Sequence, residues 1–553
     1  MRTTTMHIGK GIVAVLLLIA AQPLLAQVDT SRLDTSVVNV INPFQPIIAE
    51  SEKLSYPPKE IVTAPEKTEL SYYVPVKLFR VNYPPVSIKP LAVSKERPLS
   101  YPGAYLKLGF GTQVSPLAEL LYTGRKLKGE EEKMNYGLFF RHFSGRGFKL
   151  DNQDFSDNNA ALFASFYPGK TLKIDSRIDF ERDARFYYGY NHADTTYDRD
   201  DVKQNYTDIN FNIGLSNSRP TKMDIDHETR FNAYYFFDRF DQSDLGFNVF
   251  TKLKKTFNSV HEVQLHLEDD YSVFQNRTVS QSNNIFLFKP GYRYMGGAWE
   301  VSGAIGIALD DKTFYPLPDI KAQWGIIQDK VIVYGGWNFE LRNLTYKQLT
   351  DRNPWIKDNT FLLRNTRFED RFAGLKGTIS KVSYDFQFAH KVMRQMPLFI
   401  NDTIDPSKFL IVYNAGTLRF FDIHGQLEYR ALSNLAFTLT GDYNIYNPEF
   451  EAEAWHLSPF LVNLNVRYNI VQKIFLTMDV FGIGGAKARL ANGTATTLNS
   501  TVDINLGATY KFSKYFSFFA ELNNLAHIKY EPYLYYPTYG FNGRLGIILT
   551  YQP

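Results

Sequence analysis

The feature that most constrains the fold is an alternation of apolar and polar side chains that runs from Gly103 to the C-terminus. In the closing stretch one face is apolar or small: Phe541, Gly543, Leu545, Ile547, Leu549 and Tyr551. A period of two places successive side chains on opposite faces of a β-strand. The alternation recurs at residues 262–268, 421–430 and 461–470, and no helical stripe appears. We therefore predict an all-β fold.

A membrane location follows from the same pattern together with composition. After the N-terminal residues, no segment approaches the roughly 20 continuous apolar residues of a transmembrane helix. Only helices and closed barrels satisfy every backbone polar group in lipid, so crossing a membrane here requires a barrel. The 44 Phe and 36 Tyr, with 15% aromatic residues overall, suit the aromatic girdles of such barrels. A single alternating strand fits a soluble β-sandwich equally well. The lengths of the connections between strands are therefore needed to distinguish a sandwich from a membrane barrel.

The connections alternate between short turns and long polar loops. The short turns are residues 168–170, 295–297, 328–330, 433–434, 471–473 and 513–514. The long loops are residues 144–158, 188–204, 343–359 and 485–497. This two-sided asymmetry is typical of outer-membrane barrels, which have short periplasmic turns. We count about 22 strands in residues 103–553, an even number as expected. Counts of about 20 and 24 also fit, because the piece at 409–414 is ambiguous.

The first residues predict export. Residues 1–26 combine the basic Arg2, His7 and Lys10 with a short apolar run and the small-residue end Leu24-Leu25-Ala26. This pattern indicates a signal peptide, with the mature chain beginning near Gln27. Together with the barrel, it predicts the outer membrane of a Gram-negative bacterium, with its lipid as a partner. The chain has no cysteine and a net charge of +4, so we expect no thiol chemistry and no nucleic-acid partner.

Residues 27–102 form a separate, proline-rich segment. Eleven of the 26 prolines lie between Pro43 and Pro102. Proline fixes φ and removes a hydrogen-bond donor, so this composition favours extended backbone. One interpretation is a disordered periplasmic tail. The other, which the apolar residues at 72–79 favour, is an extended strap along the lumen or along a periplasmic or outer-membrane protein partner. Residues 103–553 follow as the barrel.

Two patches resemble TonB-dependent outer-membrane receptors. The last hairpin carries Leu522-Asn523-Asn524-Leu525, Tyr530, Tyr536-Pro537, Gly540 and Gly543-Arg544. Residues 103–122 and 155–166 are similar to a group of such proteins from Bacteroidetes. The resemblance implies a large barrel preceded by a plug domain and a TonB-binding box. Residues 27–102 are short and proline-rich for a plug, and no TonB box is evident near Gln27, so we expect a plug-less type. Energy-coupled uptake then stays open.

The sequence offers few candidate metal-binding or catalytic residues. Calcium takes carboxylate and carbonyl oxygens, and acidic residues cluster in two loops: Asp151, Asp154 and Asp157, and Asp194, Asp198, Asp200 and Asp201. Neither loop has the glycine or terminal glutamate of an EF-hand, so we predict solvated loops and no metal. No sequence context singles out a nucleophile with its histidine and carboxylate. We therefore predict no catalytic residue, no cofactor and no enzyme activity.

Charged residues on the polar faces of the strands are the remaining candidates. We predict that they face the lumen: His266, His424, Glu428, Arg430, Arg467 and Arg544. One hypothesis makes them a charged conduit, and the other has them simply paired across neighbouring strands in a wet interior. For function, we expect solute transport or a partner-gated pore, with the resemblance in its favour. The alternative is a structural barrel in an outer-membrane assembly, secretion or surface-lipoprotein complex.

Overall fold

The computed structural model describes residues 103–551, apart from residues 129–130, 148–149, 220, 359–361 and 415. The predictions for residues 1–26 and 27–102 lie outside the described residues. Within the described part, no helix is both long and apolar enough to span a membrane.

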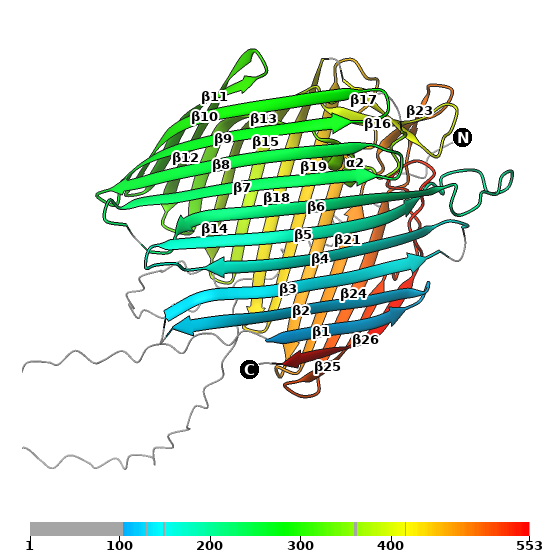
Figure 1. Ribbon diagram of the computed structural model, residues 1–553, viewed down its shortest axis with the longest axis horizontal. Helices are drawn as coiled ribbons and strands as arrows, with labels where there is room; N and C mark the ends of the chain where they lie inside the picture. The colour runs from blue at the N-terminus through cyan, green and yellow to red at the C-terminus, as the bar shows by residue number, and fades with distance from the viewer. Residues whose placement is uncertain are drawn as a thin grey trace, which may run out of the picture. The chain divides into compact units, whose positions relative to one another are not determined.

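A single antiparallel sheet of 22 strands closes on itself to form a barrel. The seam joins β1 (Ala104–Gly111) to β26 (Asn542–Tyr551), in a register that runs from Ala104 opposite Tyr551 to Gly111 opposite Arg544. In Figure 1 the blue β1 lies beside the red β26. Closure leaves no strand edge unpaired, which is what a sheet in lipid requires. The predicted all-β barrel and its count of 22 strands are confirmed.

The other strands of the barrel follow chain order. They are β2 (Ser115–Lys128), β3 (Glu131–Arg146), β4 (Asp154–Phe166), β5 (Leu172–Phe186), β6 (Lys203–Asn217), β7 (Ile225–Asp238), β8 (Ser243–Phe257), β9 (His261–Gln275), β10 (Ser280–Gly296), β11 (Trp299–Asp310), β12 (Thr313–Ile327), β13 (Val331–Arg342), β14 (Thr366–Ile379), β15 (Val382–Arg394), β18 (Thr417–Leu432), β19 (Leu435–Pro448), β20 (Phe460–Ile470), β21 (Ile474–Ile483), β24 (Thr501–Lys511) and β25 (Phe516–Asn523).

Four further strands lie outside the barrel sheet. β16 (Pro397–Asn401) pairs with β17 (Phe409–Tyr413), and β22 (Lys487–Arg489) pairs with β23 (Ala495–Thr497). The ambiguous piece at 409–414 is therefore a loop hairpin. Among the described residues there is one short helix, α2 (Tyr346–Arg352). It begins after Thr345, whose hydroxyl accepts a hydrogen bond from the Gln348 N–H and caps the helix.

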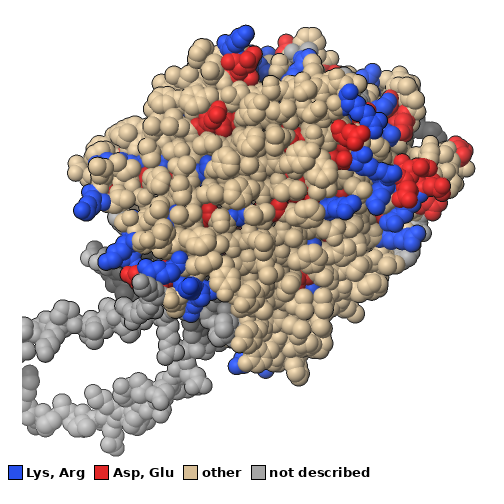
Figure 2. Space-filling view, viewed as in Figure 1, with Lys and Arg blue, Asp and Glu red and all other residues tan. Residues whose placement is uncertain are grey.

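The alternation sorts side chains into an apolar outer face and a polar inner face. Leu545, Ile305 and Leu162 are 67%, 64% and 60% exposed, whereas the Arg544 side chain is 8% exposed. Trp299 and Trp324 stack on the outer face, with ring centroids 5.2 Å apart, as interfacial aromatic residues of barrels do. Figure 2 shows one side of the barrel that is largely free of charge between charged ends. This outer face fits a lipid environment.

The two ends of the barrel differ as predicted. The chain enters at Ala104 and leaves at Tyr551 on the same end, and every connection at that end is a short turn. At the other end, long loops follow β5, β13, β15, β19, β21 and β25. We call these the turn end and the loop end. In outer-membrane barrels the turns are periplasmic and the long loops are extracellular.

Candidate functional site: a lumen closed by packed loops

Buried aromatic and aliphatic side chains pack together at the loop end. This group, which we call the loop core, comprises Tyr188, Tyr206, Phe236, Phe274, Leu344, Tyr346, Leu349, Ile356, Leu363, Phe399, Phe409 and Tyr536. Tyr206, Phe236 and Phe274 belong to the barrel wall, and the others come from loops and the short elements within them. The loops after β5, β13, β15 and β25 are therefore fastened to one another and to the wall.

Trp355 and Tyr536 lie at the centre of this packing. Their rings stack with centroids 3.9 Å apart. Tyr536 also contacts the rings of Tyr188, at 4.8 Å, and Phe409, at 5.8 Å. The Trp355 Nε1–H donates to the Phe186 carbonyl (2.9 Å), and the Tyr536 hydroxyl donates to the Ser407 carbonyl. Aromatic side chains thus bury large areas while their polar atoms satisfy loop carbonyls.

Three wall carboxylates hold the start of α2. The Lys347 ammonium forms an ion pair with Asp208. The Lys347 N–H donates to Asp244 Oδ2 (3.3 Å), and the Tyr346 hydroxyl donates to Asp238 Oδ2 (2.9 Å). All three aspartates are buried. A buried carboxylate without partners is costly, so these contacts fix the loop after β13 against β6, β7 and β8. We call this set of contacts the α2 anchor.

The buried phenols of this region stay neutral. Burial raises the pKa of Tyr187, Tyr346 and Tyr536 well above its ordinary value. Each hydroxyl therefore remains a hydrogen-bond donor over the physiological pH range, and Tyr187 uses it on the Ile356 carbonyl (3.0 Å). The loop core contains no ionised phenol that would draw in water.

A half-buried histidine, His456, links the loops after β15, β19 and β25. His456 Nδ1 lies 2.9 Å from the Phe399 carbonyl, and its Nε2 lies 3.3 Å from the Leu534 N–H. An N–H can only donate, so Nε2 accepts and Nδ1 carries the proton. The ring packs against Phe409 and Tyr533. Burial lowers the pKa of His456 from 6.5 to about 4, so its neutral form suits this position.

The six charged residues predicted from the sequence lie on β9, β18, β20 and β26 and do not form one site. Three of them pair with other charged residues within or across strands. Arg544 Nη1 lies 2.8 Å from Glu521, His266 Nε2 lies 3.1 Å from Glu268, and His424 Nδ1 lies 2.7 Å from Asp442. Two others pair with each other, since Arg430 Nε lies 2.6 Å from Glu428. For Arg467 we find no ion pair with any described residue.

The structure corrects part of the prediction for the two acidic loops. The structure places Asp154 and Asp157 in β4, not in a loop, because strands extend beyond the apolar band and become polar on both faces. Asp154 pairs with Arg199 (2.8 Å) and Asp157 pairs with Arg185. Asp194, Asp198, Asp200 and Asp201 lie in the loop after β5 and are exposed. No group of three potential metal ligands occurs among the described residues.

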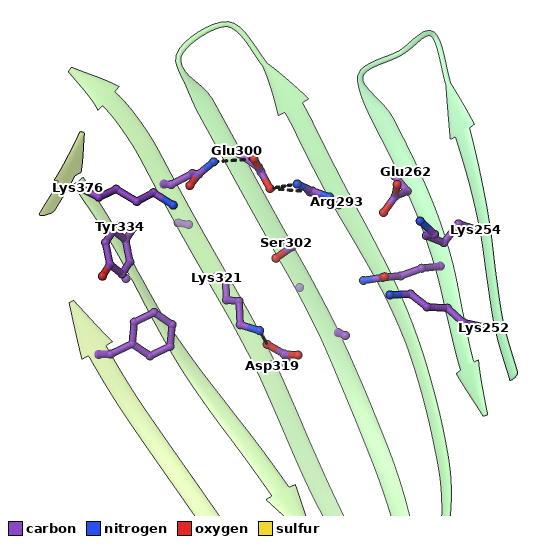
Figure 3. A pocket seen from close by; sticks show the side chains of 17 residues that line it. Lys252, Lys254, Glu262, Arg293, Glu300, Ser302, Asp319, Lys321, Tyr334 and Lys376 are labelled. Atoms are coloured by element: carbon purple, nitrogen blue, oxygen red, sulfur yellow. Dashed lines mark hydrogen bonds and ion pairs between the residues drawn. The ribbon is translucent and has the colours of Figure 1, made fainter. Parts of the chain in front are cut away.

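Sequence reasoning missed a charged hollow on the barrel wall, with a volume of about 440 Å³. Figure 3 shows Lys252 and Lys254 on one side of it, Lys376 on the opposite side and Ser302 between them. These side chains come from β8, β14 and β11. The available signal was the pair of lysines two residues apart on β8, which the alternation assigns to one face. We call this feature the inner-wall hollow.

Comparison with known proteins gives a fold. No protein-family model matches the chain, and no curated protein matches it in sequence. Solved structures do match. The FrpB iron transporter from Neisseria meningitidis (F5-1 variant) aligns with a TM-score of 0.66 at 9% identity, over 82% of each chain. The siderophore receptor PirA from Acinetobacter baumannii gives 0.63 at 8% identity, over 82% of this chain and 81% of that one.

A mutant of the ferric enterobactin receptor PfeA from Pseudomonas aeruginosa gives a TM-score of 0.61 at 9% identity, over 82% of this chain and 81% of that one. At 8–9% identity these likenesses show the fold, which is that of the barrels of these receptors and transporters. The resemblance stated from the last hairpin is confirmed at this level. A closed barrel with an apolar outer face also agrees with the predicted outer-membrane location. The names of these neighbours describe receptors and a transporter.

Proposed function

We propose that this protein is an outer-membrane receptor or transporter that passes a solute through a gated lumen. The observation that carries the proposal is the loop core, which joins four loops to the wall at one end of a polar-lined barrel. The names of the structural neighbours, which describe iron and siderophore receptors or transporters, support transport. The structural-scaffold alternative is not favoured, because no neighbour named above is a scaffold.

The gate is the loop after β13. Moving it would leave Asp208, Asp238 and Asp244 without the partners that α2 supplies. Removing one partner of a buried ion pair typically costs about 3–5 kcal/mol. The closed state is therefore the resting state, and opening requires a ligand or a partner protein that binds the open state more tightly. The lumen-facing charges, His266, His424, Glu428, Arg430, Arg467 and Arg544, would then contact the passing solute.

Single-channel conductance in planar bilayers tests the gate. We expect the mature protein to be closed and the double variant Trp355→Ala/Tyr536→Ala to conduct. A control with matched changes on the outer face, Phe286→Ala/Phe388→Ala, should stay closed. If the double variant folds as a barrel and still fails to conduct, the loop core is not the gate. Stoichiometric subunits that co-purify with a silent barrel would then revive the scaffold hypothesis.

We further propose that residues 27–102 act as a periplasmic or lumenal segment that meets a periplasmic partner such as TonB. The proline content of the segment and the receptor-like barrel support this. The test compares the single-channel conductance of the Trp355→Ala/Tyr536→Ala variant with and without residues 27–102. Smaller conductance with the segment indicates a lumenal position, and equal conductance indicates a periplasmic one. A pull-down with the C-terminal domain of TonB then tests the partner, and no capture by the mature protein would argue against TonB.

A further inference from the structure

The inner-wall hollow is a recess in the wall that small residues keep open. Its lining includes Ser302 and Ala304 on β11, which lie on the face opposite to the exposed Val301 and Ile305 and therefore face the lumen. Longer charged side chains from β8 and β14 rise on either side (Figure 3). The hollow lies near the turn end, since Lys254 stands three residues before the end of β8 at Phe257. A solute in the lumen can reach these groups.

Two of the carboxylates in the lining are already satisfied. Glu300 accepts from Arg293 Nε and from Gln323 Nε2, each at 2.6 Å. Asp319 accepts from Lys289 Nζ at 2.6 Å and lies 3.2 Å from Lys321 Nζ. The negative charge of both carboxylates is balanced by neighbouring cations. They are not available to the other lysines of the hollow.

Three lysines in the lining lack an acidic partner. Lys252, Lys254 and Lys376 are half-buried and line the hollow together with a single further carboxylate, Glu262. No ion pair joins any of the three to a described carboxylate. Glu228, Asp226 and Asp385 stand opposite Lys252, Lys254 and Lys376 on the neighbouring strands, but Glu228 pairs with Arg230 and Asp385 accepts from Tyr334. Lys376 is held by the ring of Tyr334, with its Nζ 5.0 Å from the ring centroid. The Tyr334 hydroxyl in turn donates to Asp385. The lining itself therefore holds five cations, Lys252, Lys254, Arg293, Lys321 and Lys376, against three carboxylates.

A second hollow on the same wall provides an internal comparison. It has a volume of about 550 Å³ and is lined by residues of β4–β7. Its cations are all paired: Lys173 with Asp175 (2.9 Å), Arg177 with Asp179 (2.6 Å), and Arg230 with Glu228. A polar lumen wall of this barrel thus normally balances its charges. The inner-wall hollow differs from this second hollow in holding three lysines without an ion pair.

We propose that the inner-wall hollow binds a small solute that carries several negative charges on phosphate or carboxylate groups. Lysine ammonium groups are point charges with three donors each, and three of them around one recess match an anion with several acceptors. Partial burial strengthens each charge–charge interaction relative to bulk water. This proposal rests on the proposed function, because it names the class of solute that the lumen accepts.

Isothermal titration of the full mature protein in detergent, with pyrophosphate and separately with citrate, tests the proposal. We expect binding of at least one, and the triple variant Lys252→Gln/Lys254→Gln/Lys376→Gln should weaken it about tenfold or more, since it removes three charged hydrogen-bond donors from the hollow. Binding of pyrophosphate alone assigns a phosphate solute, and binding of citrate alone assigns a carboxylate one. Circular dichroism confirms that each variant is folded.

The control variant removes the same charge from the exposed turns through Lys330→Gln, Lys473→Gln and Lys514→Gln. It should change affinity by less than about twofold, because exposed charges are largely screened. No binding of either probe to the mature protein, or an equal loss in the control, would overturn the proposal. Failure of the proposed function is distinct: it appears as a folded Trp355→Ala/Tyr536→Ala barrel that binds the probe but does not conduct.

Discussion

Mild acid should loosen the loop end of this barrel through His456. The folded state holds this ring neutral, with Nδ1–H donating to the Phe399 carbonyl (2.9 Å) and Nε2 accepting from the Leu534 N–H. A proton added at Nε2 would point at the Leu534 N–H, which cannot accept a hydrogen bond. The protonated ring is therefore incompatible with the packed loops, and its formation requires the loop after β19 to open.

The magnitude follows from the pKa of the group. Burial lowers the pKa of His456 from 6.5 to about 4. One pH unit corresponds to about 1.4 kcal/mol, so the packed loops lose about 3 kcal/mol of stability in total when the pH falls through this range. Because the folded state lowers the pKa of a basic group, the stability of the packed loops falls as the pH falls. The stabilisation is complete above pH 6.5, decreases as the pH falls below it, and is lost by about pH 4.

Hydrogen–deuterium exchange of residues 449–459 and 524–541, corrected for intrinsic rates, measures this loss. Protection should fall between pH 7 and pH 4.5 in the native chain. His456→Gln cannot titrate and should remove most of the pH dependence. His527→Gln, a change in the same group of loops at an exposed position, should retain it. If protection of the native chain is independent of pH, or if His456→Gln shows the same loss, the assignment to His456 is wrong.

Three further predictions concern the gate and the membrane face. Lys347→Met leaves Asp208 unpaired and should weaken the α2 anchor by about 3–5 kcal/mol, seen as faster exchange of residues 346–352; adding Asp208→Asn should restore much of the protection. Tyr536→Ala should open a cavity that costs the loop core about 3–5 kcal/mol, measured by limited proteolysis of the loops. Ile305→Lys should lower folding stability in lipid by about 2–4 kcal/mol in urea titrations, whereas lysine at the inward-facing Thr440 should have little effect.

The barrel was predictable because its determinants are local. Alternation assigns each side chain to a face whichever strand lies beside it, and the lengths of the connections distinguish the two ends. The closing stretch shows this: its sequence alone separates Leu545 from Arg544, and the structure exposes the first to the outside and pairs the second with Glu521. The count of strands then follows from the number of alternating segments.

The loop core was not predictable because its contacts join distant parts of the chain. Trp355 and Tyr536 stack although 180 residues of sequence separate them, and nothing near either residue indicates the other. The strands β16 and β17 are short, mostly apolar runs without alternation, so their sequences do not show that they pair with each other and, at Phe409, with Ile356 instead of joining the barrel. Asp154 was assigned to a loop because a strand beyond the lipid band is polar on both faces, so the local pattern loses its contrast there.

The gate and the inner-wall hollow are connected by the same strand. β8 begins at Ser243, and Asp244 at its loop end accepts from the backbone of α2, while Lys252 further along lines the hollow. The eight residue steps from Asp244 to Lys252 span about 27 Å of strand. A small solute in the hollow cannot touch α2 across that distance. A barrel wall of hydrogen-bonded strands also has no second conformation through which binding in the hollow could move the loop after β13. The loops must therefore be released by what binds at them directly, and the hollow then acts on a solute that has already passed the gate.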